Sequence, residues 1–145
     1  MKYAYRLAAL LALMSSHAAA EDVINATLYK NPSCACCDAY ADYLRVNGFE
    51  VRVIEHPNMS QIKQKHGVRK DLEGCHSTVI GDYVVEGHVP VGPIKRLLAE
   101  RPAIKGISLP GMPEGSPGMS GTKEGAFEIL TITGKPEPAQ LYAKE

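Results

Sequence analysis

Four cysteines are the residues of this 145-residue chain whose types and spacing best suit a reactive site. Three of them occupy the segment Cys34-Ala35-Cys36-Cys37, and the fourth, Cys75, lies well downstream. Thiolates are soft, electron-rich donors, which are the ligands that Cu(I) prefers. Because adjacent cysteines do not easily all face one tetrahedral ion, we expect thiolates that bridge several ions. The spacing therefore predicts a polynuclear copper site.

Two other interpretations of the cysteines stay open. Cys34 and Cys37 form a C-x-x-C pair, which a thiol-disulfide oxidoreductase would use as nucleophile and resolving thiol, although Cys36 between them invites scrambling during exchange. An even number of cysteines in an exported protein also permits structural disulfides, and a closed zinc site is a related possibility. Zinc usually draws on two separated ligand pairs, and two disulfides within this set would be crowded.

Histidines and methionines extend the candidate ligand set. His76 follows Cys75, and His88 precedes a predicted helix, so either imidazole is placed to ligate Cu(II). Met112 and Met119 lie in a Pro/Gly-rich segment, and a thioether binds Cu(I) without losing a proton. The plainer alternatives are solvated loop histidines and methionines that pack as flexible apolar side chains.

The thiols are expected at the turn between a strand and a helix. Residues 23–29 are rich in β-branched and apolar side chains and predict a strand. Ser33 is the expected N-cap of the following helix, and Gly48 is placed to end it. Alternating residues over 49–54 predict a second strand, which completes a βαβ unit.

The remaining elements predict a thioredoxin-like domain of the α/β class. A short helix is expected over 59–66, a hairpin from strands 78–80 and 83–86, and a helix over 90–100. The order β-α-β-α-β-β-α is that of a thioredoxin-like fold. A Pro/Gly/Met-rich loop over 108–121 and a last strand over 126–133 would extend the domain, which is expected to span 21–134, with a flexible tail over 135–145.

Residues 1–20 have the features of a secretory signal peptide. Lys2 and Arg6 precede a short apolar stretch, and the segment ends in Ala18-Ala19-Ala20, so cleavage is expected after Ala20. Removal of these 20 residues would leave 125, the size of one domain. The 16 basic residues would fall to 14 against 16 acidic ones, a charge of about −2 that indicates no nucleic-acid partner. No later segment is apolar enough over its length to span a membrane.

Five short motifs stand out along the chain. They are Cys34-Ala35-Cys36-Cys37, Gly74-Cys75-His76-Ser77-Thr78, Glu86-Gly87-His88-Val89-Pro90, Pro110-Gly111-Met112-Pro113 and Gly115-Ser116-Pro117-Gly118-Met119. Together they resemble the CopG-type periplasmic copper-resistance proteins. The resemblance covers nearly all of the chain beyond Ala20, and the combination of motifs is specific although each one alone is weak.

The resemblance implies a thioredoxin-like fold, a cysteine-bridged copper cluster and a role in changing copper between its two oxidation states in the periplasm. The expected partners are copper ions and a periplasmic electron-transfer or copper-exporting protein. Whether the site turns over as a copper oxidoreductase or only holds metal stays open. The ligands it implies are Cys34, Cys36, Cys37 and Cys75, with His88, Met112 and Met119 as further candidates.

One departure from thioredoxins themselves bears on the alternatives. Those enzymes place a cis-proline before the strand that faces the active site, and here the matching stretch is Cys75-His76-Ser77-Thr78. A backbone element that grips disulfide substrates is therefore absent, and a cysteine lies close to its place. This difference favours metal binding over thiol-disulfide exchange.

Overall fold

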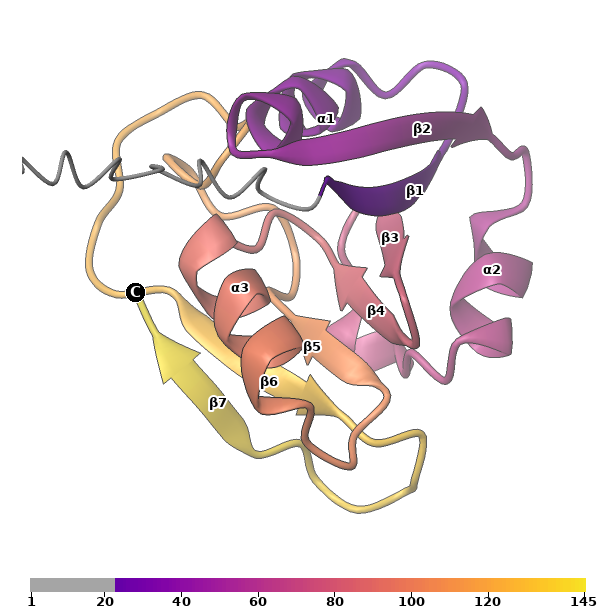
Figure 1. The fold of residues 1–145 in the computed structure, drawn as a ribbon, viewed down its shortest axis with the longest axis vertical. Coiled ribbons are helices and arrows are strands. Elements are labelled where there is room, and N and C mark those ends of the chain that lie inside the picture. Colours follow the sequence, from indigo (N-terminus) through magenta and orange to yellow (C-terminus); the bar gives the residue numbers. More distant parts are fainter. Residues whose placement is uncertain (1–22) are drawn as a thin grey trace, which may run out of the picture.

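A βαβ unit begins the described part of the chain, which is residues 23–145 of the computed structural model. Strand β1 (Ile24–Lys30) leads into helix α1 (Ala35–Val46), and β2 (Phe49–Glu55) returns parallel to β1 (Figure 1). The buried residues of α1 recur three or four positions apart and form one apolar stripe. They are Cys37, Tyr40, Ala41 and Leu44.

The ends of α1 only partly match the sequence prediction. Gly48 has a φ of 94°, the left-handed conformation expected just beyond a helix end. The N-cap is Cys34 rather than Ser33, and it makes no side-chain capping bond. The helix therefore starts one residue later than predicted, at Ala35 directly after the first cysteine, which leaves the backbone donors of its first turn beside the thiols.

A ββα unit follows and completes the predicted thioredoxin-like arrangement. Helix α2 (Met59–Lys65) and a 3-10 turn at Lys70–Leu72 lead to the hairpin β3 (Ser77–Ile80) and β4 (Tyr83–Glu86). Strand β3 lies antiparallel to both β1 and β4, so the first four strands have the order β2-β1-β3-β4. Helix α3 (Val91–Glu100) comes next and ends at Arg101, which is left-handed.

Three further strands extend the sheet to seven. Strand β5 (Gly106–Ser108), which the sequence did not predict, pairs parallel with β4. The predicted strand over 126–133 is β6 (Glu128–Ile132), and it pairs with both β5 and β7 (Leu141–Lys144). The sheet order is β2-β1-β3-β4-β5-β6-β7.

The expectation of a flexible tail over 135–145 is wrong for its last residues. They form β7, which carries the C-terminus in Figure 1, and Tyr142 and Ala143 pack against the main core. The backbone of Glu145 exchanges two hydrogen bonds with Phe127, at 2.8 and 3.1 Å. The two prolines at 136 and 138 precede this strand rather than interrupt it, so they do not prevent the pairing.

Both faces of the sheet are covered. Val85 of β4 belongs to the main core with residues of α1 and α3, whereas its neighbour Val84 packs with Val68 and Leu72 of the segment after α2. Adjacent strand residues point to opposite faces of a sheet. Helices α1 and α3 therefore cover one face, and the segment after α2 covers the other. Within residues 23–145 no helix is both long and apolar enough to cross a membrane, and the predicted signal peptide, 1–20, lies outside these residues.

We expect Leu44→Ala to lower the free energy of unfolding by about 2–5 kcal/mol, because the side chain is fully buried in helix α1, which carries Cys36 and Cys37. Val46→Ala on the same helix is the control. That side chain is 83% exposed, so its removal should change stability by less than about 0.5 kcal/mol. Urea unfolding of both variants in one redox state measures the difference, and equal losses would contradict the packing described here.

Candidate metal centre

The pairing of β1 with β3 brings the four sulfur atoms together. Tyr29 near the end of β1 lies opposite Ser77 at the start of β3, so the turn before α1 meets the segment before β3. The Cys75 sulfur lies 3.8 Å from that of Cys36 and 3.6 Å from that of Cys37. All four sulfurs lie within 4.8 Å of one another.

The structure holds a disulfide between Cys34 and Cys37, and leaves Cys36 and Cys75 as free thiols. This is the C-x-x-C pair that the oxidoreductase interpretation uses, and the crowded arrangement of two disulfides among the four cysteines is not formed. Residues three apart across a first helical turn have their Cα atoms 5.4 Å apart here, within the range that a disulfide spans. A metal site that uses all four thiolates therefore requires the reduced protein.

His88 lies beside Cys75 with its ring orientation set by a loop. Its Nε2 atom is 2.9 Å from the Cys75 sulfur, and its Nδ1 atom is 2.7 Å from the carbonyl oxygen of Pro117. A carbonyl only accepts hydrogen bonds, so Nδ1 carries the proton and Nε2 presents a lone pair to Cys75. This is the arrangement in which a histidine ligates a metal while its other nitrogen is held by a backbone oxygen.

His76 is the second imidazole of the site. It is fully buried against the Tyr40 ring, and its Nδ1 atom lies 3.3 Å from the Cys75 sulfur. Within residues 23–145 its Nε2 atom has no hydrogen-bond partner. A buried polar atom without a partner costs free energy, and a bound metal or water would remove that cost.

Burial favours the uncharged forms of three donors of the site, His76, His88 and Cys75. Burial lowers the pKa of His76 well below its ordinary value, with further contributions from His88 and Lys63, and burial also lowers the pKa of His88. Burial, with the neighbouring Cys36, raises the pKa of the Cys75 thiol to about 12. Both imidazoles are therefore neutral at neutral pH, and a metal must displace the Cys75 proton in order to bind.

The Pro/Gly/Met-rich loop lies against the start of α1. Gly118 touches the helix so closely that an added Cβ would lie 2.7 Å from the backbone nitrogen of Tyr40 and 3.0 Å from the carbonyl oxygen of Cys36. Met119, the next residue, is half-buried, whereas the side chain of Met112 is 56% exposed. The structure thus brings the four cysteines, His76 and His88 together, with Met119 next to the contact on α1 and Met112 facing solvent.

A buried ion pair that the sequence analysis did not identify supports the Cys75 segment. Lys63 of α2 donates to the Glu86 carboxylate and, at 2.9 Å, to the carbonyl of Gly74. Glu86 also accepts from the Gly74 amide at 2.8 Å and from Ser77 Oγ at 2.6 Å. Burial raises the pKa of the Glu86 carboxyl, and the bonds from Lys63 and Ser77 oppose that rise. The pair therefore holds the backbone on both sides of Cys75.

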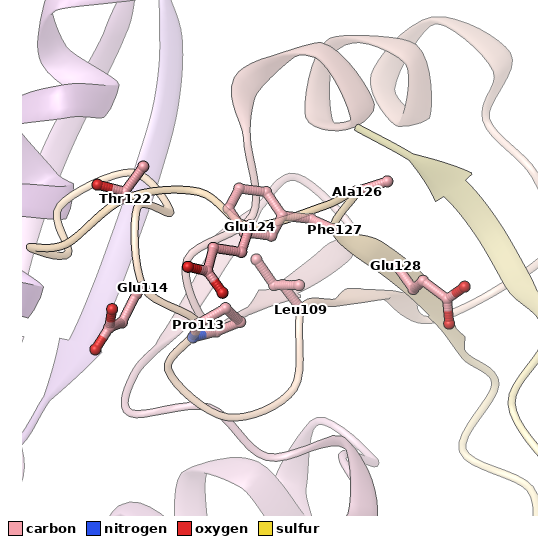
Figure 2. A pocket seen from close by; sticks show the side chains of 8 residues that line it. All are labelled: Leu109, Pro113, Glu114, Thr122, Glu124, Ala126, Phe127 and Glu128. Carbon is pink, nitrogen blue, oxygen red and sulfur yellow. The ribbon is translucent and has the colours of Figure 1, made fainter.

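A hollow beside the loop is separate from the sulfur cluster. Figure 2 shows the apolar side chains of Leu109, Pro113 and Phe127 with the Glu124 carboxylate among them, around a volume of about 370 Å³. The other residues that line it are Glu114, Thr122, Ala126 and Glu128. All eight lining residues lack sulfur and imidazole donors, so this hollow is not a part of the candidate metal centre.

Comparison with known proteins gives one family description and two similar structures. The family model "Protein of unknown function, DUF411" matches residues 72–119. Two solved structures of a copper resistance protein, CopG form 1 and form 2, are 34% identical to this chain, with TM-scores of 0.77 and 0.76. The matches cover 86% and 84% of this chain and 98% of each solved chain. No curated protein matches the chain.

We expect Glu86→Gln to lower the free energy of unfolding by about 3–5 kcal/mol, because it leaves the buried Lys63 ammonium without a counter-charge. The control is Glu100→Gln, which breaks a pair with Arg96 whose side chains are about half exposed and should cost less than about 1 kcal/mol. Chemical denaturation of the metal-free protein measures both. A Glu86 variant as stable as the control would show that the buried pair does not support the fold.

Proposed function

Because this chain belongs to the CopG family of copper resistance proteins, we propose that it binds copper ions in a cluster bridged by the thiolates of Cys34, Cys36, Cys37 and Cys75. The observation that carries the proposal is the group of four sulfur atoms within 4.8 Å of one another. Metal–thiolate bonds of about 2.3 Å allow two sulfurs on one ion to lie up to about 4.6 Å apart. The sulfur separations of 3.5, 3.6 and 3.8 Å fit ions shared between neighbouring thiolates.

We further propose that the site interconverts Cu(I) and Cu(II) in copper resistance. Thiolates favour Cu(I) and imidazoles suit Cu(II), and the two neutral histidines next to Cys75 add nitrogen donors to the sulfur set. His88 is the imidazole with a free lone pair facing Cys75, and Met119 and the exposed Met112 are candidate thioether donors on the loop. A periplasmic electron-transfer or copper-exporting protein is the partner that such a site would need.

The disulfide supports a second candidate function, thiol-disulfide exchange by Cys34 and Cys37. The bond joins the two outer cysteines of a C-x-x-C pair at a helix start, which is where dithiol oxidoreductases carry theirs. The free Cys36 lies 3.5 Å from Cys34, however, and would compete for the mixed disulfide during each exchange. Copper binding therefore remains the leading proposal.

We expect the fully reduced protein to bind more than one Cu(I) ion per chain in an anaerobic titration, because bridging thiolates share each sulfur between ions. Cys36→Ser should lower that number, since it removes a sulfur from the centre of the group. His56→Ala, which removes an imidazole bonded to the backbone of Asn58 outside the group, should leave it unchanged. A stoichiometry that stops at one ion per chain would contradict the cluster.

The double variant with Cys36→Ser and Cys75→Ser separates copper binding from thiol-disulfide exchange. It keeps the Cys34–Cys37 pair and removes both free thiols. We expect the loss of the copper cluster. Even without the competing Cys36 we expect no efficient disulfide exchange with a reduced dithiol substrate, because the stretch before β3 lacks the proline that grips disulfide substrates in thioredoxins. Full exchange activity in this variant, together with lost copper binding, would favour the oxidoreductase.

We also propose that the protein acts in the periplasm after removal of residues 1–20. Intact-mass measurement of the protein recovered from the periplasmic fraction should give a chain that begins at Glu21. A full-length chain retained in the cytoplasm would exclude this location.

A further inference from the structure

We propose that the hollow between Leu109, Pro113 and Phe127 is where a partner protein docks, and that the partner inserts there an apolar side chain flanked by lysine or arginine. This inference deepens the proposed function, on which its link to copper rests, because it describes the chemistry of the partner that the copper site needs. Docking itself does not require bound metal. The residues that line the hollow are separate from the four cysteines and two histidines of the candidate metal centre.

The hollow has an apolar floor and a charged rim. Leu109 and Phe127 are only 3% and 8% exposed, and Pro113 is half-buried beside them, around a volume of about 370 Å³. This volume lies within the range of about 300–1,000 Å³ that is typical of binding pockets. Glu114 and Glu124 lie at the rim and are exposed. An apolar centre with a polar rim is the usual arrangement of a protein–protein interface.

The rim carries acidic charge that the chain only partly neutralises. Glu128 pairs with Lys144 at 2.8 Å, whereas Glu114 and Glu124 form no ion pair within residues 23–145. Figure 2 shows the three carboxylates well apart, with Glu124 between Glu114 and Glu128. A single small cation would need carboxylates that converge on one point. Separated carboxylates around an apolar floor instead complement a peptide segment that carries several basic side chains.

The Phe127 ring already binds an ammonium group of the chain itself. Lys123 Nζ lies 4.9 Å from the centre of the ring, within the distance of about 6 Å at which a cation is attracted to an aromatic face. Lys123 is exposed, so a basic side chain of a partner can join it or take its place. Three carboxylates against the ammonium groups of Lys123 and Lys144 still leave the hollow with a net negative charge.

The backbone of the loop joins this hollow to the metal centre. A Cβ added at Gly87 would lie 2.5 Å from the carbonyl oxygen of Leu109, so Leu109 lies directly against the residue before His88. Pro117, which holds His88 Nδ1 at 2.7 Å, belongs to the same loop as Pro113. A partner seated on Leu109 and Pro113 therefore lies beside the residues that position His88.

The test is an NMR titration of isotope-labelled, metal-free protein with a short capped peptide in which lysines flank one leucine on both sides. We expect the peptide to shift the backbone signals of Leu109, Glu114 and Phe127. A peptide with alanine in place of the leucine should bind about 10-fold more weakly, because it buries less apolar surface. A peptide with glutamate in place of every lysine should not bind. No shifts, shifts confined to another surface, or equal binding of the alanine peptide would overturn the proposal.

A double variant, Glu114→Gln with Glu124→Gln, removes the rim charge and keeps the apolar floor. It should weaken binding of the lysine peptide about 5–10-fold, and higher salt should weaken its binding less than that of the unchanged protein. The control, Glu50→Gln with Asp82→Asn, removes the same charge on β2 and in the turn between β3 and β4. All four side chains are exposed, so both double variants should keep the fold. Equal weakening by the two would make the effect one of net charge and overturn the docking site.

A Cu(I) titration of the rim variant separates this inference from the proposed function. The variant should bind as many Cu(I) ions as the unchanged protein, because the rim carboxylates do not belong to the metal centre. Copper binding without peptide binding would overturn only the docking site. Peptide binding without copper binding would overturn only the proposed function.

Two further measurements test other occupants of the hollow. Sedimentation of the protein alone shows whether a second copy of the chain binds there, and titration with a simple alkylammonium ion shows whether a small cation does. We expect neither. Self-association that the rim variant abolishes, or alkylammonium binding as tight as that of the peptide, would overturn the assignment to a partner protein.

Discussion

The buried ion pair between Lys63 and Glu86 is the interaction on which the arrangement of the site depends. Removing two charges from water costs several kcal/mol per ion, and only a completely bonded pair recovers that cost. Here the carboxylate accepts bonds from Lys63, Gly74 and Ser77, and the ammonium also reaches the Gly74 carbonyl. These bonds join α2, the segment before β3 and the end of β4, so Cys75 and His88 take their places from one shared anchor.

The site is assembled from three parts of the chain that are held by different means. Helix α1 and its N-cap, Cys34, present three cysteines, and the ion pair between Lys30 and Asp38, whose charged atoms are 2.8 Å apart, links the first turn of the helix to β1. Cys75 is fixed by sheet pairing and by the buried pair behind it. The loop acts through one carbonyl, since Pro117 sets which nitrogen of His88 is free. The positions of the cysteines and the protonation of His88 are thus set by different contacts.

Most of the fold and the centre of the site could be predicted from the sequence, because both depend on local signals. Residue alternation and the glycine at 48 indicate the βαβ unit, and once that unit is in place the topology brings Cys75 to the start of α1. The features that could not be predicted leave no recognisable pattern in the neighbouring residues. Strand β5 has only three residues, and Glu86 at the end of a hairpin strand is typical of a solvent-facing side chain until α2 packs over it. The Cys34–Cys37 bond depends on redox state, which spacing alone does not specify.

That bond also has a consequence for how the protein tolerates changes of redox state. It links residues only three positions apart, so it constrains the unfolded chain little, by about 2 kcal/mol on the chain-entropy model against about 4.7 kcal/mol for a 100-residue loop. Besides Cys37, the buried face of α1 includes Tyr40, Ala41 and Leu44, which take no part in the bond, so most of the packing of α1 does not depend on it. Reduction and oxidation of this pair can therefore alternate within a folded molecule, because the stability of the fold depends little on the bond.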